Sequence, residues 1–195
     1  MEFKKANFIE GDFITLREIT LEDAEIIFHW RTGPSGEFMN QLDGYNLQMQ
    51  INWMKTRSDN EINYIIIDKK NKEKVGMVAI VGISKQDKNA EIGRLLLAPE
   101  FLKKSNPYGL EALKICSNQI LKEWGFHKIY GNVLSENVPM LKLQKYLGMV
   151  EEGLLKDQKS IKGIKYDLHL VALFSEAFKL KYIPRINMLL KAFNK

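Results

Sequence analysis

The sequence has few of the residues that build disulfides, metal centres or membrane spans. Its 195 residues include one cysteine, Cys116, and three histidines, so an internal disulfide and a cysteine-based metal site are excluded. His29, His127 and His169 show no HxxxH or HxH spacing, which gives zinc chemistry little support. No apolar run approaches the roughly 20 residues that span a bilayer, and the charged start is atypical of a signal peptide. We therefore expect a cytoplasmic protein that binds no metal.

The overall composition is ordinary for a globular domain. Hydrophobic residues make up 45% and charged residues 27% of the chain, which argues against wholesale disorder. The length suits one core better than two. The formal net charge of +5 suits either an anionic ligand such as a nucleotide cofactor or an undirected basic surface. Because the basic residues are scattered without an aromatic repeat, we expect no nucleic-acid partner.

Hydrophobic periodicity predicts an α/β fold. Alternating or β-branched runs predict strands at about 13–18, 63–68, 75–83, 90–97, 128–134, 151–156 and 165–173. Apolar residues at three- and four-residue spacing predict helices at about 20–31, 47–57, 109–124 and 139–146. Thr20 and Asp23 suit an N-cap followed by an acidic first turn. This order is typical of a mixed sheet covered by helices.

The C-terminal segment has a different character from the rest of the chain. We assign residues 1–178 to a single domain and residues 179–195 to a basic amphipathic tail. The tail carries an apolar face beside Lys and Arg, so it can dock on the domain, form a homodimer or contact an anionic membrane. Pro184 leaves room for only a short helix, which favours docking or dimerisation.

The centre of the sequence resembles a known family. Its motifs are Ala90-Glu91-Ile92-Gly93, Leu97-Ala98-Pro99-Glu100-Phe101, Tyr108-Gly109-Leu110-Glu111-Ala112-Leu113, Gly125-Phe126-His127-Lys128-Ile129-Tyr130, Asn137-Val138-Pro139-Met140 and Leu147-Gly148-Met149. In type and spacing they resemble the GNAT N-acetyltransferases, over about residues 12–174. The resemblance is closest to the branch that contains ribosomal-protein N-terminal and nucleotide-amino-sugar acetyltransferases.

The resemblance implies both a fold and an activity. The fold is a mixed, mostly antiparallel sheet of about seven strands flanked by about four helices, with strands splayed at the acetyl-CoA site. The activity is transfer of an acetyl group from acetyl-CoA to a primary amine, by direct attack in a ternary complex. Two alternatives remain open: N-terminal acetylation of a protein, and a non-catalytic module that binds acyl-CoA.

A loop that enters a helix N-terminus suits a pyrophosphate, because it offers free amides and the positive end of the helix dipole. The resemblance implies cofactor contacts here from Lys103, Lys104, Ser105, Asn106, Tyr108, Gly109 and Leu110. Pro107 stands where the family has glycine. Because proline lacks an N–H, one phosphate contact is lost or comes from a neighbour such as Ser105 or Asn106.

The resemblance also implies how the acetylated arm of the cofactor is held. Backbone groups of Leu95, Leu96 and Leu97 pair with the arm, and one amide polarises the thioester carbonyl. Asn137 and Gln144 complete the cofactor site. Strand alternation predicts Glu91, Gly93, Leu95 and Leu97 on one face.

Glu91 matches the general base of histone-type members, and the alternative is a structural glutamate bound to backbone or arginine. The family's acid is a tyrosine, and Gln144 stands in its place. Tyr146 lies two residues later, about 200° around the helix, and should point elsewhere, so the acid is unassigned.

The acceptor side resembles enzymes that acetylate nucleotide-linked deoxy sugars, through Trp30, Arg31, Glu37, Met39 and Trp53. Arg31 suits a phosphate, and tryptophan or methionine suits a sugar methyl or a base. Packing explains each tryptophan equally well. Glu37 and Asp43 suit orientation of a cationic amine, although a solvated loop acid is more common.

Overall fold

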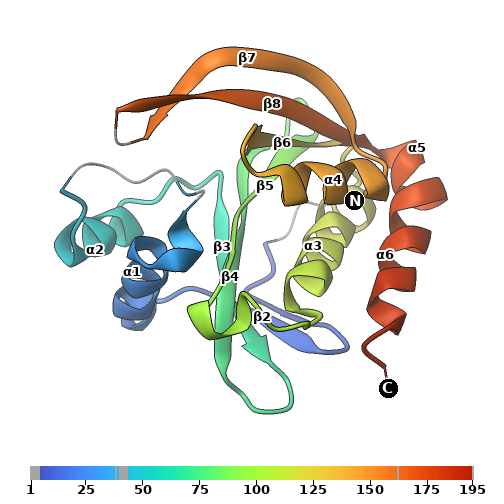
Figure 1. The fold of residues 1–195 in the computed structure, drawn as a ribbon. Helices are drawn as coiled ribbons and strands as arrows, with labels where there is room; N and C mark the ends of the chain where they lie inside the picture. The colour runs from blue at the N-terminus through green and yellow to red at the C-terminus, as the bar shows by residue number, and fades with distance from the viewer. Residues whose placement is uncertain (1–4, 38, 40–43, 162, 195) are drawn as a thin grey trace.

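The computed structural model describes residues 5–37, 39, 44–161 and 163–194, built around one eight-stranded sheet (Figure 1). In spatial order the strands are β1 (Phe8–Glu10), β2 (Ile14–Glu18), β3 (Ile62–Asp68), β4 (Lys74–Ser84), β5 (Asn89–Leu97), β6 (Lys128–Leu134), β8 (Ile164–Phe174) and β7 (Val150–Ile161). The β5–β6 pair is parallel and every other neighbouring pair is antiparallel. The predicted mixed sheet is confirmed, and the short strand β1 is the additional one.

Helices cover both faces of the sheet (Figure 1). On one side lie α1 (Ala24–Thr32) and α2 (Leu47–Lys55). On the other lie α3 (Tyr108–Asn118), its π-helical continuation η4 (Gln119–Glu123), α4 (Val138–Leu147) and α6 (Ile183–Lys191). The hydrophobic core divides accordingly, into a larger cluster beneath α3 and α6 and a smaller one beneath α1 and α2.

The hairpin β7–β8 is longer than predicted and arches over the end of the sheet, above α1 and α2 (Figure 1). Strand β7 extends to Ile161, well past its predicted end at 156, whereas β8 (164–174) agrees closely with the predicted 165–173. Most residues of β7 are exposed, so its outer half carries no apolar alternation from which a strand is predicted. The outer end of the hairpin therefore lies near α1 and α2.

The C-terminal segment docks on the domain. Short helices α5 (Ser175–Ala177) and η5 (Phe178–Tyr182) lead into α6, and Tyr182, Ile186 and Leu190 are buried in the larger core cluster. The Ser117 hydroxyl of α3 donates to the Tyr182 hydroxyl at 3.0 Å. Docking is thus the alternative that the structure shows. None of the helices in the described part of the chain is both long and apolar enough to cross a membrane.

Asp23 links the first helical turn to the sheet. Thr20 and Asp23 form a capping box at the 3₁₀ turn η1 (Leu21–Asp23). The fully buried Asp23 carboxylate accepts two hydrogen bonds from Arg17, at 2.9 and 3.0 Å, and one from Lys74 at 2.7 Å. Burial alone would raise the pKa of Asp23, but these bonds outweigh it and hold the pKa at about 2, below the ordinary 3.8.

Asp23 therefore makes stability depend on acid pH. Since its folded pKa is depressed, its contribution is complete above about pH 4 and is lost as the pH falls through 2. The shift corresponds to about 2 kcal/mol. We expect Asp23→Asn to lower the free energy of unfolding in urea at pH 7, and the deficit to shrink toward pH 2. Exposed Glu22→Gln is the matched control, and an equal loss at both pH values would contradict this role.

Candidate active site

Strands β5 and β6 separate partway along their length. Their parallel pairing covers only Asn89–Lys128, Ala90–Ile129 and Glu91–Tyr130. Beyond Glu91 a cleft of about 130 Å³ opens between them, bounded by α3 and α4. Its lining includes Ile92, Leu95, Leu113, Asn137, Met140 and Gln144. The cleft therefore runs from the interior of the sheet to the first turn of α4.

A β-bulge in β5 lies beside this cleft. Gly93 faces Ala79 and Leu96 faces Met77, so Arg94 and Leu95 together stand opposite one residue of β4. Arg94 has a φ of 53°, in the left-handed region that non-glycine residues rarely occupy. A bulge leaves one residue outside the ladder, which frees backbone groups at the edge of the cleft.

The bulge corrects the predicted alternation. Leu95 packs with Ile92 in the larger core cluster, on the side of α3, whereas Glu91 and Gly93 line a cavity on the opposite face. The prediction that Glu91 and Leu95 share a face is wrong because the extra residue reverses the two-residue period. The leucines after the bulge therefore face α3, while Glu91, before it, faces the acceptor side.

Glu91 stands half-buried in a cavity of about 530 Å³ beneath the β7–β8 hairpin. Burial raises its pKa, and hydrogen bonds from Asn132 partly offset the rise. The Asn132 side-chain amide donates to Glu91 Oε2 at 3.0 Å. The side chain of Glu91 is thus held by an amide side chain of β6. A carboxylate with a raised pKa beside an open cavity has the properties of a general base.

The cleft and the Glu91 cavity share a wall. Both are lined by Gly93, Arg94, Asn132 and Leu134. A ligand in the cleft and a second ligand beside Glu91 would therefore meet across the bulge. This arrangement suits transfer of a group between two bound molecules.

The predicted phosphate loop is held by its own side chains. The Asn106 amide donates to the carbonyls of Phe101, at 2.9 Å, and Lys104, at 2.8 Å, and its oxygen accepts from Tyr108 N at 3.2 Å. Asn106 is therefore occupied in shaping the loop. Lys103, Lys104 and Ser105 are exposed. The amides of Gly109 and Leu110 lie in the first turn of α3, where a helix offers no internal acceptor.

Gly109 offers a direct test of this helix start as an anion site. A Cβ there would lie 3.9 Å from Leu95 Cδ2, an ordinary contact, so Gly109→Ala should fold normally. Because the added methyl blocks close approach of a phosphate to the backbone, we expect acetyl-CoA affinity to fall about 10-fold, measured by calorimetry. Gly153→Ala on β7, with a comparable contact at 3.8 Å, is the control. Equal affinities in the two variants would contradict the assignment.

Helix α4 contributes Asn137 and Gln144. Asn137 caps the helix, accepting from Met140 N at 3.3 Å, and also lines the cleft. Gln144 lines the cleft about two turns later on the same face of the helix. Tyr146 points elsewhere, as predicted: it is exposed, and the Arg185 guanidinium lies 5.5 Å from its ring. Cys116 is fully buried, and burial raises the pKa of its thiol to about 12, which argues against a nucleophilic role.

Cationic and aromatic side chains gather on the acceptor side. The Arg31 guanidinium lies 5.0 Å from the Tyr45 ring and 5.9 Å from the Trp53 ring, and Arg94 lies 5.0 Å from Trp53. Burial lowers the pKa of Arg31. This cluster joins α1, α2 and the bulge. It places two of the predicted acceptor residues, Arg31 and Trp53, next to the wall between the cavities.

The remaining predicted acceptor residues are more dispersed. Trp30 is 4% exposed in the smaller core cluster, so its ring packs α1 onto the sheet. Met39 lines the cleft, and with Glu37 it borders a third cavity of about 410 Å³ against Ile161, Ile164 and Tyr166 of the hairpin. Asp43 lies outside the described residues.

Comparison with known proteins agrees with this geometry. Residues 14–150 match the family model described as an acetyltransferase (GNAT) domain. The chain belongs to the GNAT acetyltransferase family. It is an acyltransferase, and enzymes of this family use acetyl-CoA as the acetyl donor.

Individual relatives are distant. The uncharacterized N-acetyltransferase p20 of Bacillus licheniformis is 25% identical over 179 residues, covering 85% of this chain and 94% of that protein. An uncharacterized protein of Methanocaldococcus jannaschii is 28% identical over 143 residues, covering 71% of this chain and 28% of that protein.

Solved structures show the same fold. A GCN5-related N-acetyltransferase from Brucella melitensis superposes with a TM-score of 0.80 at 17% identity, covering 96% of this chain and 87% of that one. Mutant forms of the spermidine/spermine N-acetyltransferase SpeG from Vibrio cholerae give 0.72 at 23% identity, with 90% and 99% covered.

Several residues at this GNAT site were not predicted from the sequence. Asn132 binds Glu91, Arg94 forms the bulge, and Tyr45 stacks on Arg31. Lys159 of the hairpin reaches the Glu91 cavity. Only Arg94 carries a local signal, as a charged residue between Gly93 and three leucines. The others depend on tertiary contacts.

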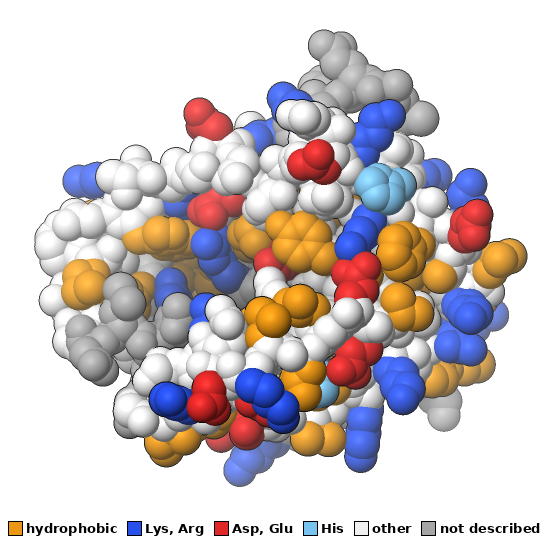
Figure 2. Space-filling view, turned by 90° about the horizontal axis from the view of Figure 1, so that it is seen from above, with side chains coloured by type: hydrophobic (Ala, Val, Ile, Leu, Met, Phe, Trp, Pro, Cys, Tyr) orange, Lys and Arg blue, Asp and Glu red, His pale blue; other side chains and the backbone are white. Residues whose placement is uncertain are grey.

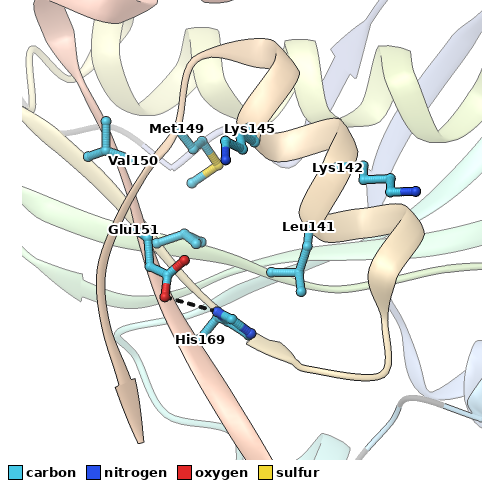
Figure 3. Close-up of a pocket in the computed structure, with 8 residues that line it drawn as sticks. Leu141, Lys142, Lys145, Met149, Val150, Glu151 and His169 are labelled. Carbon is cyan, nitrogen blue, oxygen red and sulfur yellow. Dashed lines mark ion pairs between the residues drawn. The ribbon is translucent and has the colours of Figure 1, made fainter.

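A separate hollow of about 470 Å³ lies between α4 and the β7–β8 strands (Figure 3). Leu141, Met149, Val150 and Val171 give it an apolar lining, Lys142 and Lys145 project from α4, and Glu151 pairs with His169 at 3.2 Å. Its lining includes neither Glu91 nor the bulge. The hollow is thus outside the GNAT site.

Proposed function

We propose that the enzyme transfers an acetyl group from acetyl-CoA directly to a primary amine, with the donor in the splayed cleft and the acceptor beside Glu91. The shared wall of the two cavities is the observation that carries this proposal. It makes a ternary complex feasible, because donor and acceptor approach from opposite faces of the sheet. Backbone amides of the bulge and of Leu95 to Leu97 would polarise the thioester carbonyl.

The chemistry needs one base and a stable leaving group. The amine nitrogen attacks the thioester carbon, the carbon–sulfur bond breaks, and the amine's proton passes to Glu91, directly or through water. The departing thiolate has modest basicity and can take its proton from water. Gln144, which lines the cleft, would donate a hydrogen bond to the sulfur. No tyrosine acid is required by this scheme.

We propose that the acceptor carries an anionic and planar portion besides its amine, as a nucleotide-linked amino sugar does. Arg31 and Trp53 suit a phosphate and a base or sugar methyl, and Lys159 adds positive charge at the Glu91 cavity. Figure 2, which looks down on the hairpin, shows acidic and basic side chains intermixed on that face. The Vibrio cholerae enzyme is named for polyamine substrates. A polyamine bound in this site would face the positive charges of Arg31, Arg94 and Lys159, which disfavour a polycation.

A product assay by mass tests the proposal. The protein is incubated with acetyl-CoA and three acceptor sets: nucleotide-linked amino sugars, polyamines, and peptides with free N-termini. We expect acetylated product from the first set. Product only from polyamines would overturn the acceptor class, and product only from peptides would favour N-terminal acetylation. Tight acetyl-CoA binding without any product would identify a non-catalytic acyl-CoA module.

A further inference from the structure

We propose that Arg94 is a positioning residue, whose side chain fixes the bulge that faces the thioester. The inference rests on the proposed function, since it concerns how the donor carbonyl meets the backbone. Arg94 lines both the cleft and the Glu91 cavity. Its backbone belongs to the wall between donor and acceptor, while its side chain extends to two other elements.

The backbone of Arg94 needs external support. Its φ of 53° is left-handed, and a non-glycine residue keeps such a conformation only where its surroundings hold it. Ladder pairing to β4 holds Gly93 and Leu96 on either side but leaves Arg94 itself unpaired, and pairing to β6 ends at Glu91. We assign the remaining constraint on Arg94 to its side chain.

Strand β3 and the residue that precedes it supply one anchor. Arg94 Nη1 donates to Glu61 Oε2 at 3.0 Å and to Asn63 Oδ1 at 2.8 Å. Asn63 Nδ2 in turn donates to Glu61 Oε1 at 3.0 Å, which closes a three-residue network. Asn63 is fully buried and the Glu61 side chain is 9% exposed. Charge-assisted bonds among buried partners hold the guanidinium in one position.

Helix α2 supplies the second anchor. The guanidinium of Arg94 lies 5.0 Å from the Trp53 ring, within range of a cation–π contact. Arg31 approaches the same ring at 5.9 Å. A ligand that binds against Trp53 would therefore also contact or displace the Arg94 guanidinium, which holds the bulge. In this proposal, one side chain connects the acceptor side to the amides that polarise the thioester.

The variant Arg94→Gly isolates the side chain's role, because glycine adopts a left-handed φ without strain. We expect a folded enzyme with a lower melting temperature, because the Glu61 carboxylate loses a buried charge partner, and a KM for acetyl-CoA close to that of the unmodified enzyme. We expect kcat to fall about 10- to 100-fold, because the backbone amide of the bulge is no longer held in position to polarise the thioester carbonyl. Lys88→Gly is the matched control: Lys88 is also left-handed, with a φ of 46°, and is exposed in the β4–β5 turn. It should retain full kcat.

An unchanged kcat in Arg94→Gly would overturn the proposal. If the acceptor's KM rises while kcat is unchanged, Arg94 contacts the acceptor instead. A second measurement does not depend on catalysis: amide hydrogen exchange from Gly93 to Leu97 should accelerate about 10-fold in Arg94→Gly but not in Lys88→Gly. If the unmodified enzyme acetylates no amine, the proposed function fails but the role of Arg94 can still be tested by hydrogen exchange. Unchanged exchange from Gly93 to Leu97 in Arg94→Gly would then contradict that role.

Discussion

Replacing Glu91 by glutamine is expected to lower kcat/KM for acetyl transfer about 10²- to 10⁴-fold near neutral pH, the usual contribution of a general base. The amide side chain would keep the shape of the carboxylate and a hydrogen bond to Asn132, so acetyl-CoA affinity should change little. Steady-state rates with the acceptor found in the product assay provide the measurement. Glu176→Gln, an exposed carboxylate on α5, gives the same charge change away from the site.

The pH profile separates a base from a structural glutamate. Burial raises the pKa of Glu91, so the rate of the unmodified enzyme should fall as the pH drops through that raised value and the carboxylate becomes protonated. In Glu91→Gln this acid limb should disappear, and the residual rate should rise with pH as the acceptor amine itself loses its proton. The two rates then converge at alkaline pH. A parallel profile in the variant would remove Glu91 as the base.

Replacing Glu111 by alanine is expected to lower the free energy of unfolding by at least about 3 kcal/mol. Glu111 of α3 is 1% exposed, and its carboxylate accepts from the amides of Asp12, at 2.6 Å, Phe13, at 2.7 Å, and Ile14, at 2.8 Å. The variant leaves all three amides without this acceptor at the start of β2. Unfolding in urea measures the loss.

Two further variants make the Glu111 result specific. Glu111→Gln keeps one acceptor oxygen and should lose less than alanine does. Lys114→Gln removes the 3.8 Å contact of the next helical turn with Asp12, a surface pair worth less than about 1 kcal/mol. Should Glu111→Ala unfold within about 1 kcal/mol of the unmodified protein, the carboxylate would not be what joins α3 to β2.

The fold was largely predictable because its signals are local. The apolar stripe of α3 and the β-branched runs of β3 and β4 have the periods of their elements, and they appear where predicted. The outer part of β7 was missed because exposed strands lack that alternation. The docked tail was left open, since an apolar face does not identify what covers it.

The candidate site was predictable in its positions and less so in its contacts. Glu91 lines the cavity beneath the hairpin, and Gly109 and Asn137 lie at the starts of α3 and α4, while their roles stay predictions. Glu91 and Leu95 face opposite sides because of the bulge at Arg94, whose one local signal is a charged residue between Gly93 and three leucines. Asn106 is engaged within its own loop, and Glu111 binds a segment nearly one hundred residues earlier. Both facts follow from tertiary geometry.

A crystal structure of the enzyme with acetyl-CoA would show whether the donor binds in the cleft between β5 and β6. We predict the pyrophosphate at the first turn of α3 beside Gly109, the acetylated arm between β5 and β6 beyond Glu91, and the thioester oxygen at an amide of the bulge. Acetyl-CoA bound in the hollow between α4 and β7–β8 (Figure 3), with the β5–β6 cleft closed, would contradict this assignment of the donor site.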